Sequence, residues 1–289
     1  QKEIAEGYKN LSNAYNMTKA DTAVRSSATA EDLPGASFAG EHETYLNVVG
    51  EENVIYAAKE AMASLWNDRA ISYRVDKGFD HFEVALSVGV QKMVRSDKGS
   101  SGVMFTLDTE SGFRDVVEID ASWGLGEMVV QGKVTPDEYL VWKTGLNNGF
   151  ASVIKKNLGS KENKMIYFGS GKKPVKEIKT NKKERENFVL TTEEIITLSR
   201  WGVEIENHYT EKAGKPTPMD MEWAKDGITG ELFIVQARPE TVQAEKSHLS
   251  ITEYKLETQA EPIVTGISVG TKVASGKVRV ITKVKNLNQ

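Results

Sequence analysis

The segment MDMEWAKDGITGELFIVQARPE, residues 219–240, constrains the fold of this chain more than any other. Two runs of alternating apolar and polar residues flank a glycine-containing loop, which is the pattern of a β-hairpin. With a side-chain period of two, Asp220 and Glu222 share one face of the first strand, opposite methionine and tryptophan. Gln236 and Arg238 share a face of the return strand. The hairpin therefore predicts a sheet with one apolar and one polar face.

The polar face of this hairpin has the chemistry of an ion-binding site. In a hairpin centred near residue 228, residues whose numbers sum to about 456 or 458 stand opposite one another, which brings Gln236 beside Asp220 or Glu222. Carboxylate and amide oxygens suit Mg²⁺, and Arg238 could hold a phosphate oxygen in a fork. These residues alone leave an alternative open, namely a solvent-facing strand pair with an internal salt bridge.

The remaining segments predict an α+β fold. Residues 51–77 carry apolar residues at helical spacing, and from Glu83 the period changes to two. The lysine-rich stretch 155–187 is weakly periodic and predicts a solvated loop or edge. Thr191 and Glu194 fit a capping box at the start of a further helix. Other expected strands are SGVMFTL, DVVEIDAS and EYLVWK.

Bulk properties narrow the class of protein. A chain of 289 residues predicts two lobes or domains. The net charge of −4 gives no reason to expect nucleic acid as a partner. The sequence contains no run of about 18 apolar residues, so no membrane span is predicted. We expect a cytoplasmic protein. The absence of cysteine excludes disulfides and thiolate metal sites. Because the sequence starts without Met and stops just after a strand-like segment, we expect a piece of a longer chain.

Three other segments have weaker signals. VRSSATAEDLPGASFAGEHETYLNV, residues 24–48, combines an arginine with a loop of small residues, which leaves backbone N–H groups open to a phosphate. ASWGLGE ends in Glu127 after a glycine turn, where an acid could bind a ribose hydroxyl or simply follow a plain turn. VGVQKMV could offer its backbone to an adenine edge, or be only a strand.

Together these segments, with DRAISYR, resemble in order the nucleotide-binding domain of the phosphoenolpyruvate synthase (pyruvate, water dikinase) family of PEP-utilising enzymes, over roughly residues 20–245. The resemblance implies an ATP-grasp fold with two lobes closing on ATP and the first lobe incomplete. GISVGTKVASGKV resembles the start of the family's swivelling phosphohistidine domain. The implied domains are 1–84 for the first lobe, 85–243 for the second, 244–262 for a linker and 263–289 for the swivelling domain.

The resemblance also assigns roles to individual residues. It implies nucleotide binding by Arg25 at the phosphate tail, by the loop from Ser37 to Gly40 with Thr44 on its return, by Gln91, Met93 and Val94 at the adenine hinge, and by Glu127 at the ribose. It implies Glu222 and Gln236 as Mg²⁺ ligands, with Asp220 and Arg238 as their companions.

In the family, ATP phosphorylates a histidine and the phosphoryl group passes to pyruvate, giving phosphoenolpyruvate, AMP and phosphate. None of the four histidines has the family's Thr-Cys-His context, so we expect the catalytic histidine and the pyruvate site beyond Gln289. The chain alone is then not expected to complete the reaction. Another phosphohistidine dikinase, such as a rifampin phosphotransferase or a glucan water dikinase, and a regulatory nucleotide-binding module remain alternatives. A homodimer is also left open.

Overall fold

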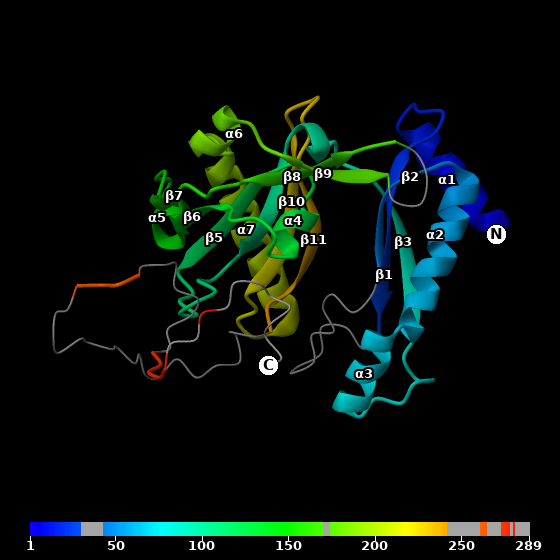
Figure 1. The fold of residues 1–289 in the computed structure, drawn as a ribbon, viewed down its shortest axis with the longest axis horizontal. Helices are drawn as coiled ribbons and strands as arrows, with labels where there is room; N and C mark the ends of the chain where they lie inside the picture. The colour runs from blue at the N-terminus through cyan, green and yellow to red at the C-terminus, as the bar shows by residue number, and fades with distance from the viewer. Residues whose placement is uncertain (30–42, 170–173, 242–260, 265–272, 278–279, 281–289) are drawn as a thin grey trace.

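The computed structural model describes residues 1–29, 43–169, 174–241, 261–264, 273–277 and 280. In this part of the chain, three antiparallel sheets of three, six and two strands combine with helices into a mixed α/β structure (Figure 1). None of the helices in these ranges combines the length and apolar character needed to cross a membrane. Ser37, Gly40, most of the expected linker and most of the expected swivelling segment lie outside the described residues.

The three-stranded sheet has the order β2-β1-β3. Its strands are β1 (Asp21–Ala28), β2 (Thr44–Val49) and β3 (Leu86–Lys92), and helices α1 (Lys2–Ala14) and α2 (Glu51–Ala63) pack with it. The core between them consists of Tyr8, Ala20, Val24, Val48, Val54, Ala57, Ala58 and Ala61. β3 pairs along its whole length with β1 and belongs to the small sheet, although the expected boundary between residues 84 and 85 assigns it to the second lobe. Alternation predicts a strand but does not identify its partner.

The helix expected over residues 51–77 is interrupted. After α2, a 3-10 turn, η1 (Ser64–Trp66), leads to Asn67, where the backbone is extended, and α3 (Asp68–Lys77) begins. The Asn67 side chain accepts a hydrogen bond of 2.7 Å from the Ala70 amide. Such a cap starts a new helix, and the apolar spacing on either side does not reveal it.

The six-stranded sheet has the order β11-β10-β4-β5-β6-β7. Its strands are β4 (Ser100–Phe105), β5 (Val116–Trp123), β6 (Asp137–Trp142), β7 (Val153–Asn157), β10 (Met219–Lys225) and β11 (Leu232–Pro239). Helix α7 (Thr192–Ala213) packs on one face, and Ile195 and Leu198 are fully buried there. The capping box of Thr191 and Glu194 is confirmed. Short elements complete the lobe: η2 (Ser96–Lys98), α4 (Glu127–Val130), α5 (Lys143–Asn147) and α6 (Lys182–Glu186).

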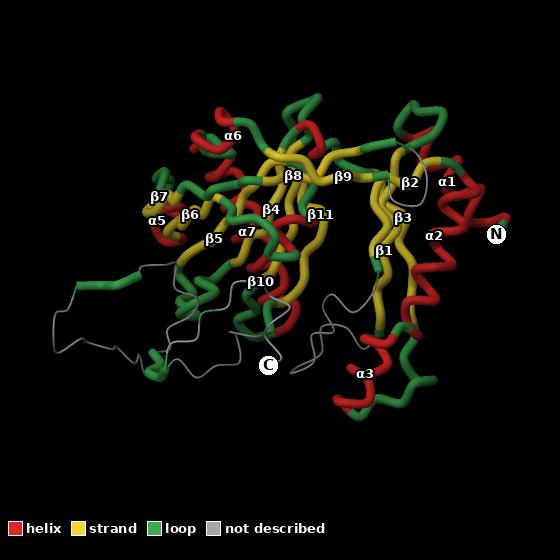
Figure 2. The backbone as a smooth tube through the Cα atoms, in the orientation of Figure 1, coloured by secondary structure: helices red, strands yellow, loops and turns green. Residues whose placement is uncertain are grey.

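The lysine-rich stretch is more ordered than a solvated loop. β7 is an edge strand, in agreement with the expected edge. In contrast to a solvated loop, β8 (Asn163–Tyr167) and β9 (Val175–Lys179) form a two-stranded hairpin. This hairpin reaches from the large sheet to the small one, as Figure 2 shows. Asn47 of β2 donates a 3.1 Å hydrogen bond to the Pro174 carbonyl, and Tyr167 donates one of 2.9 Å to Asp21 of β1.

One lysine of this stretch is buried as an ion pair. Lys161 and Asp137 have no exposed side-chain surface, and the Lys161 ammonium contacts the Asp137 carboxylate. Asp137 also accepts hydrogen bonds of 2.8 Å from the amides of Gly159 and Val189. A buried charge needs such a full set of partners, because its desolvation is costly. The pair thus fixes the segment before β8 against β6.

We expect Lys161→Met to lower the free energy of unfolding by about 3–5 kcal/mol, because the Asp137 carboxylate then stays buried without its counter-ion. Lys155→Met is the matched control, since Lys155 is half-exposed and lies 3.4 Å from an equally exposed Glu138. Its loss should change stability by no more than about 1 kcal/mol. Urea denaturation measures both, and equal effects would contradict a structural role for the buried pair.

Candidate functional site

The observed hairpin register confirms one of the two expected pairings. Asp220 stands opposite Arg238 and Glu222 opposite Gln236, so the numbers of each pair sum to 458. The other face of β10 is held in the core under α7, where Met219 and Met221 are fully buried. Burial of that apolar face directs all four polar side chains to the opposite side of the sheet.

A β-bulge in β11 turns this polar face toward the small sheet. Ile234 pairs with Trp223, while Gln236 already pairs with Glu222, so Val235 is the extra residue. Its carbonyl oxygen accepts a 3.3 Å hydrogen bond from the Gln91 side chain and a 3.5 Å hydrogen bond from Arg25 Nη1. Bulged residues leave the ladder and are free to pair elsewhere. The sum rule for hairpin partners gives no warning of this bulge.

Arg25 joins the two sheets. Its neighbour Val24 faces the helices in the core of the small sheet, so alternation directs Arg25 to the other face. Thr44 on β2 and Gly89 on β3 flank it. Arg25 Nη2 donates a 2.8 Å hydrogen bond to Glu222 Oε2 and a second one to Gln236 Oε1. The Arg25 and Glu222 side chains are each about a quarter exposed. Three of the expected site residues thus meet at one nitrogen atom.

The donor set at this meeting point fits a hard divalent cation. A carboxylate oxygen and an amide oxygen converge on one positively charged nitrogen. Within the described part of the chain, no group of three or more His, Cys, Asp or Glu residues forms a ready metal cage. Mg²⁺ commonly binds through one or two protein oxygens and takes its other ligands from phosphates and water. Glu222 and Gln236 therefore fit Mg²⁺ that arrives with a phosphate ligand.

Arg238 pairs with Asp220 rather than standing alone. Its Nε and Nη2 atoms donate hydrogen bonds of 2.9 and 2.7 Å to the same Asp220 oxygen. Burial raises the pKa of Asp220, while the charge and hydrogen bond of Arg238 lower it. The cross-strand salt bridge of the alternative interpretation is thus present beside the Arg25 contact, and the two interpretations are compatible.

The expected adenine hinge lies where β3 leaves the small sheet. The Met93 amide donates a 2.9 Å hydrogen bond to the Asp21 carbonyl, and the Lys92 ammonium donates one of 2.7 Å to the Met93 carbonyl. Lys92 also lies 2.6 Å from the Asp21 carboxylate. The backbone amide and carbonyl of Met93 therefore already have partners within the protein. Val94 is the next residue along the chain. Sequence reasoning missed Lys92 and Asp21, whose contact is set by tertiary packing.

Glu127 begins α4 directly after a tight glycine turn. Gly124 has φ +85°, and a Cβ there would lie 2.5 Å from the Met165 carbonyl oxygen, so the turn requires glycine. Burial raises the pKa of Glu127, and the charge of Glu222 raises it further, whereas Arg25 lowers it. Glu127 is therefore electrically coupled to the same meeting point.

Sequence reasoning noted DRAISYR as a segment of the resemblance but assigned no role to Arg74, its last arginine. Its side chain is fully buried, its Nε donates a 2.9 Å hydrogen bond to His81, and its guanidinium lies 5.3 Å from the Trp66 ring centroid. Nη1 and Nη2 have no hydrogen-bond partner among the described residues. The only sequence signal is an arginine in a helix that the apolar pattern predicts to be half-buried.

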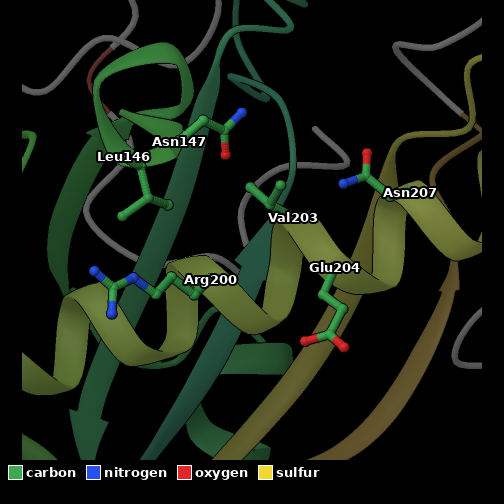
Figure 3. Close-up of a pocket in the computed structure, with 6 residues that line it drawn as sticks. All are labelled: Leu146, Asn147, Arg200, Val203, Glu204 and Asn207. Carbon is green, nitrogen blue, oxygen red and sulfur yellow. The ribbon is translucent and has the colours of Figure 1, made fainter. Parts of the chain in front are cut away.

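A separate pocket of about 330 Å³ lies between α7 and the α5 turn. Figure 3 shows its lining from α7 and from the α5 turn: Leu146, Asn147, Arg200, Val203, Glu204 and Asn207. Among the residues that the structure describes, none of the expected site residues lines it. We therefore assign the candidate site to the polar face of the β10–β11 hairpin.

The face of the large sheet that carries Glu222 also carries a carboxyl with a strongly raised pKa. Asp120 on β5 stands opposite Glu138 on β6. Burial raises its pKa to about 7, the charges of Glu118 and Glu138 raise it as well, and Lys155 lowers it. The folded state therefore holds this proton more tightly than the unfolded chain, and stability falls as the pH rises toward 7.

Asp120→Asn removes this loss, because asparagine does not ionise. We expect its stability advantage over the wild type to grow by roughly 2–3 kcal/mol between pH 5 and pH 8. Urea denaturation across that range measures it, with Asp76→Asn as the exposed control. A constant difference at every pH would rule out the raised pKa.

Comparisons with known proteins identify the family of this chain. The family described as pyruvate phosphate dikinase, AMP/ATP-binding domain matches residues 1–259. Phosphoenolpyruvate synthase of Aquifex aeolicus is 56% identical over 294 residues, covering 100% of this chain and 34% of the relative. The Helicobacter pylori and Escherichia coli proteins of that name are 52% and 50% identical, with 99% of this chain and 36% and 35% of the relatives covered. The chain spans about a third of the length of these relatives. It belongs to the family of pyruvate phosphate dikinase AMP/ATP-binding domains.

Proposed function

We propose that this chain is the ATP-binding portion of a phosphoenolpyruvate synthase and that Mg²⁺–ATP binds between its two larger sheets. The observation that carries the proposal is the meeting of Arg25 from the small sheet with Glu222 and Gln236 from the large one. A phosphate chain placed there has a cation on one side and metal-binding oxygens on the other. The relatives' name favours this reading over a rifampin phosphotransferase.

The proposed architecture is an ATP-grasp domain with two lobes. Because β3 pairs with β1, we place the first lobe at residues 1–92 and the second at 93–243. The proposed linker, 244–262, then leads to the start of a swivelling phosphohistidine domain at 263–289. This arrangement is supported by the hairpin β8–β9 and the Arg25 contact, which both connect the two sheets.

Each residue has a separate task in the proposed site. Arg25 holds the phosphate tail with two parallel donors. Gln91, Met93 and Val94 lie along the adenine edge, with the backbone of Val94 as the contact because the Met93 amide and carbonyl already pair with Asp21 and Lys92. Glu127 accepts from a ribose hydroxyl. Asp220 and Arg238 support Glu222 and Gln236 from the next position along the hairpin. Bound Mg²⁺ would neutralise charge on the phosphoryl oxygens, which is the main need in phosphoryl transfer.

In the whole protein, we propose that the phosphoryl group passes to a histidine outside this chain and then to pyruvate. The products are phosphoenolpyruvate, AMP and phosphate, and the protein acts in the cytoplasm. By this proposal the residues of this chain alone bind ATP only weakly and do not complete the transfer. Phosphohistidine formation in the full-length protein is therefore the activity that tests the site.

Glu222→Ala should nearly abolish ATP-dependent phosphorylation of the histidine, because it removes the only carboxylate among the two proposed metal ligands. The fold should survive, since Glu222 lies on the polar face and not under α7. Incorporation of labelled phosphate in the full-length protein measures the effect. Glu231→Ala, at an exposed position of the same hairpin, is the control. Wild-type incorporation by Glu222→Ala would overturn the assignment.

Arg25→Lys should weaken ATP binding by roughly 1–3 kcal/mol, the range for a charge-assisted hydrogen bond. Lysine keeps the charge but loses the planar fork. Calorimetry with ATP and with adenosine separates phosphate contacts from the rest of the site, and Arg200→Lys on exposed α7 surface is the control. Equal losses for both ligands would show that Arg25 does not act on phosphate.

A further inference from the structure

We propose that Arg25 occupies the metal position of the nucleotide-free protein as a resident cation, so that divalent metal gains Glu222 and Gln236 only when a nucleotide phosphate draws Arg25 away. The inference rests on the proposed function and assigns a regulation to the same site. It follows from the contacts of one atom. Arg25 Nη2 donates both to Glu222 Oε2 and to Gln236 Oε1, and these are the two oxygens that a metal would need.

Two cations cannot use these oxygens together. Arg25 Nη2 lies 2.8 Å from Glu222 Oε2, whereas Mg²⁺ requires its oxygen ligands at about 2.0–2.1 Å. A metal bound to both Glu222 Oε2 and Gln236 Oε1 at that distance would lie at the position of Nη2, which contacts the same two oxygens, and would repel its charge. Both groups are about three-quarters buried, so water screens this repulsion less than at an exposed surface. Metal binding and the Arg25 contact are therefore mutually exclusive.

The surrounding charges explain why a resident cation is present. Burial raises the pKa of Glu127 and the charge of Glu222 raises it further, so a second carboxyl lies near the Arg25 contact. Asp220 is also coupled to Glu222, but Arg238 already binds it through two nitrogens. Arg25 thus supplies the positive charge that Glu222 needs when no nucleotide is bound.

Arg25 is held by two short hydrogen bonds from one nitrogen atom and one long hydrogen bond from the other. Nη2 makes the two short contacts, while Nη1 reaches the bulged Val235 carbonyl at 3.5 Å. A phosphate offers the guanidinium a new anionic partner in the same fork geometry. Transfer of Arg25 to phosphate then leaves both oxygens to the metal that the nucleotide carries. The site accordingly takes up a metal–nucleotide complex and resists free metal.

The test is a titration of the full-length protein with Mn²⁺ in the absence of nucleotide. Binding is measured as the loss of the electron paramagnetic resonance signal of free Mn²⁺. The wild type and Glu222→Gln should bind equally, because neither exposes this site. Arg25→Met should gain one Mn²⁺ site per chain. Its affinity for Mn²⁺ at this position should be at least tenfold higher than that of the wild type. The double variant Arg25→Met with Glu222→Gln should lose that site, which separates it from any other metal site in the protein.

Arg95→Met is the matched control, because it removes one positive charge that pairs with Asp97 and not with Glu222 or Gln236. It should add no Mn²⁺ site. A Glu222-dependent Mn²⁺ site in the nucleotide-free wild type would overturn the inference, as would a folded Arg25→Met protein without an added site. Since this titration contains no nucleotide, its failure leaves the proposed ATP site standing. Failure of that site would appear instead in the calorimetry with ATP and adenosine.

Discussion

Burial of one face of β10 against α7 is the constraint on which the candidate site depends. Met219 and Met221 fill the core there, and a one-residue slip would move the whole apolar set into solvent. The register is therefore strongly fixed, and with it the pairing of Glu222 with Gln236. Hydrophobic burial on the other side of the same strand therefore orders the polar face. Polar contacts between exposed side chains would order it only weakly.

The site is built across two sheets, and each contributes what the other lacks. The large sheet supplies the oxygens of Glu222 and Gln236. Burial first, and neighbouring carboxylates second, raise the pKa values of Asp120, Glu127 and Asp220 around them. The small sheet supplies Arg25 and the amide of Gln91. The bulge at Val235 brings its carbonyl to both of these donors. The ligand-free arrangement is thus a charge-compensated junction between two separately stabilised sheets.

The sequence was sufficient for features set by local periodicity and insufficient for those set by distant contacts. The Thr191 cap follows from spacing and residue type and is confirmed, and one of the two expected hairpin registers is observed. The cap at Asn67 and the buried Lys161 were missed, because a single asparagine or lysine in a polar stretch has many exposed alternatives. The pairing of Arg25 with Glu222 joins residues 197 positions apart. No periodicity relates them, and only their separate phosphate and metal roles, implied by resemblance, placed both in one site.

The choice of arginine at position 25 follows from the geometry of three acceptors. Glu222 Oε2, Gln236 Oε1 and the Val235 carbonyl oxygen lie around one planar group, and its two terminal nitrogens reach all three. A lysine ammonium could neutralise Glu222, but it would present its charge at one point on a flexible stem. The planar fork that spans these acceptors is also the shape that matches a phosphate. In the proposed site, one side chain therefore holds the sheets together and also turns to the nucleotide phosphate, because both partners require the same donor geometry.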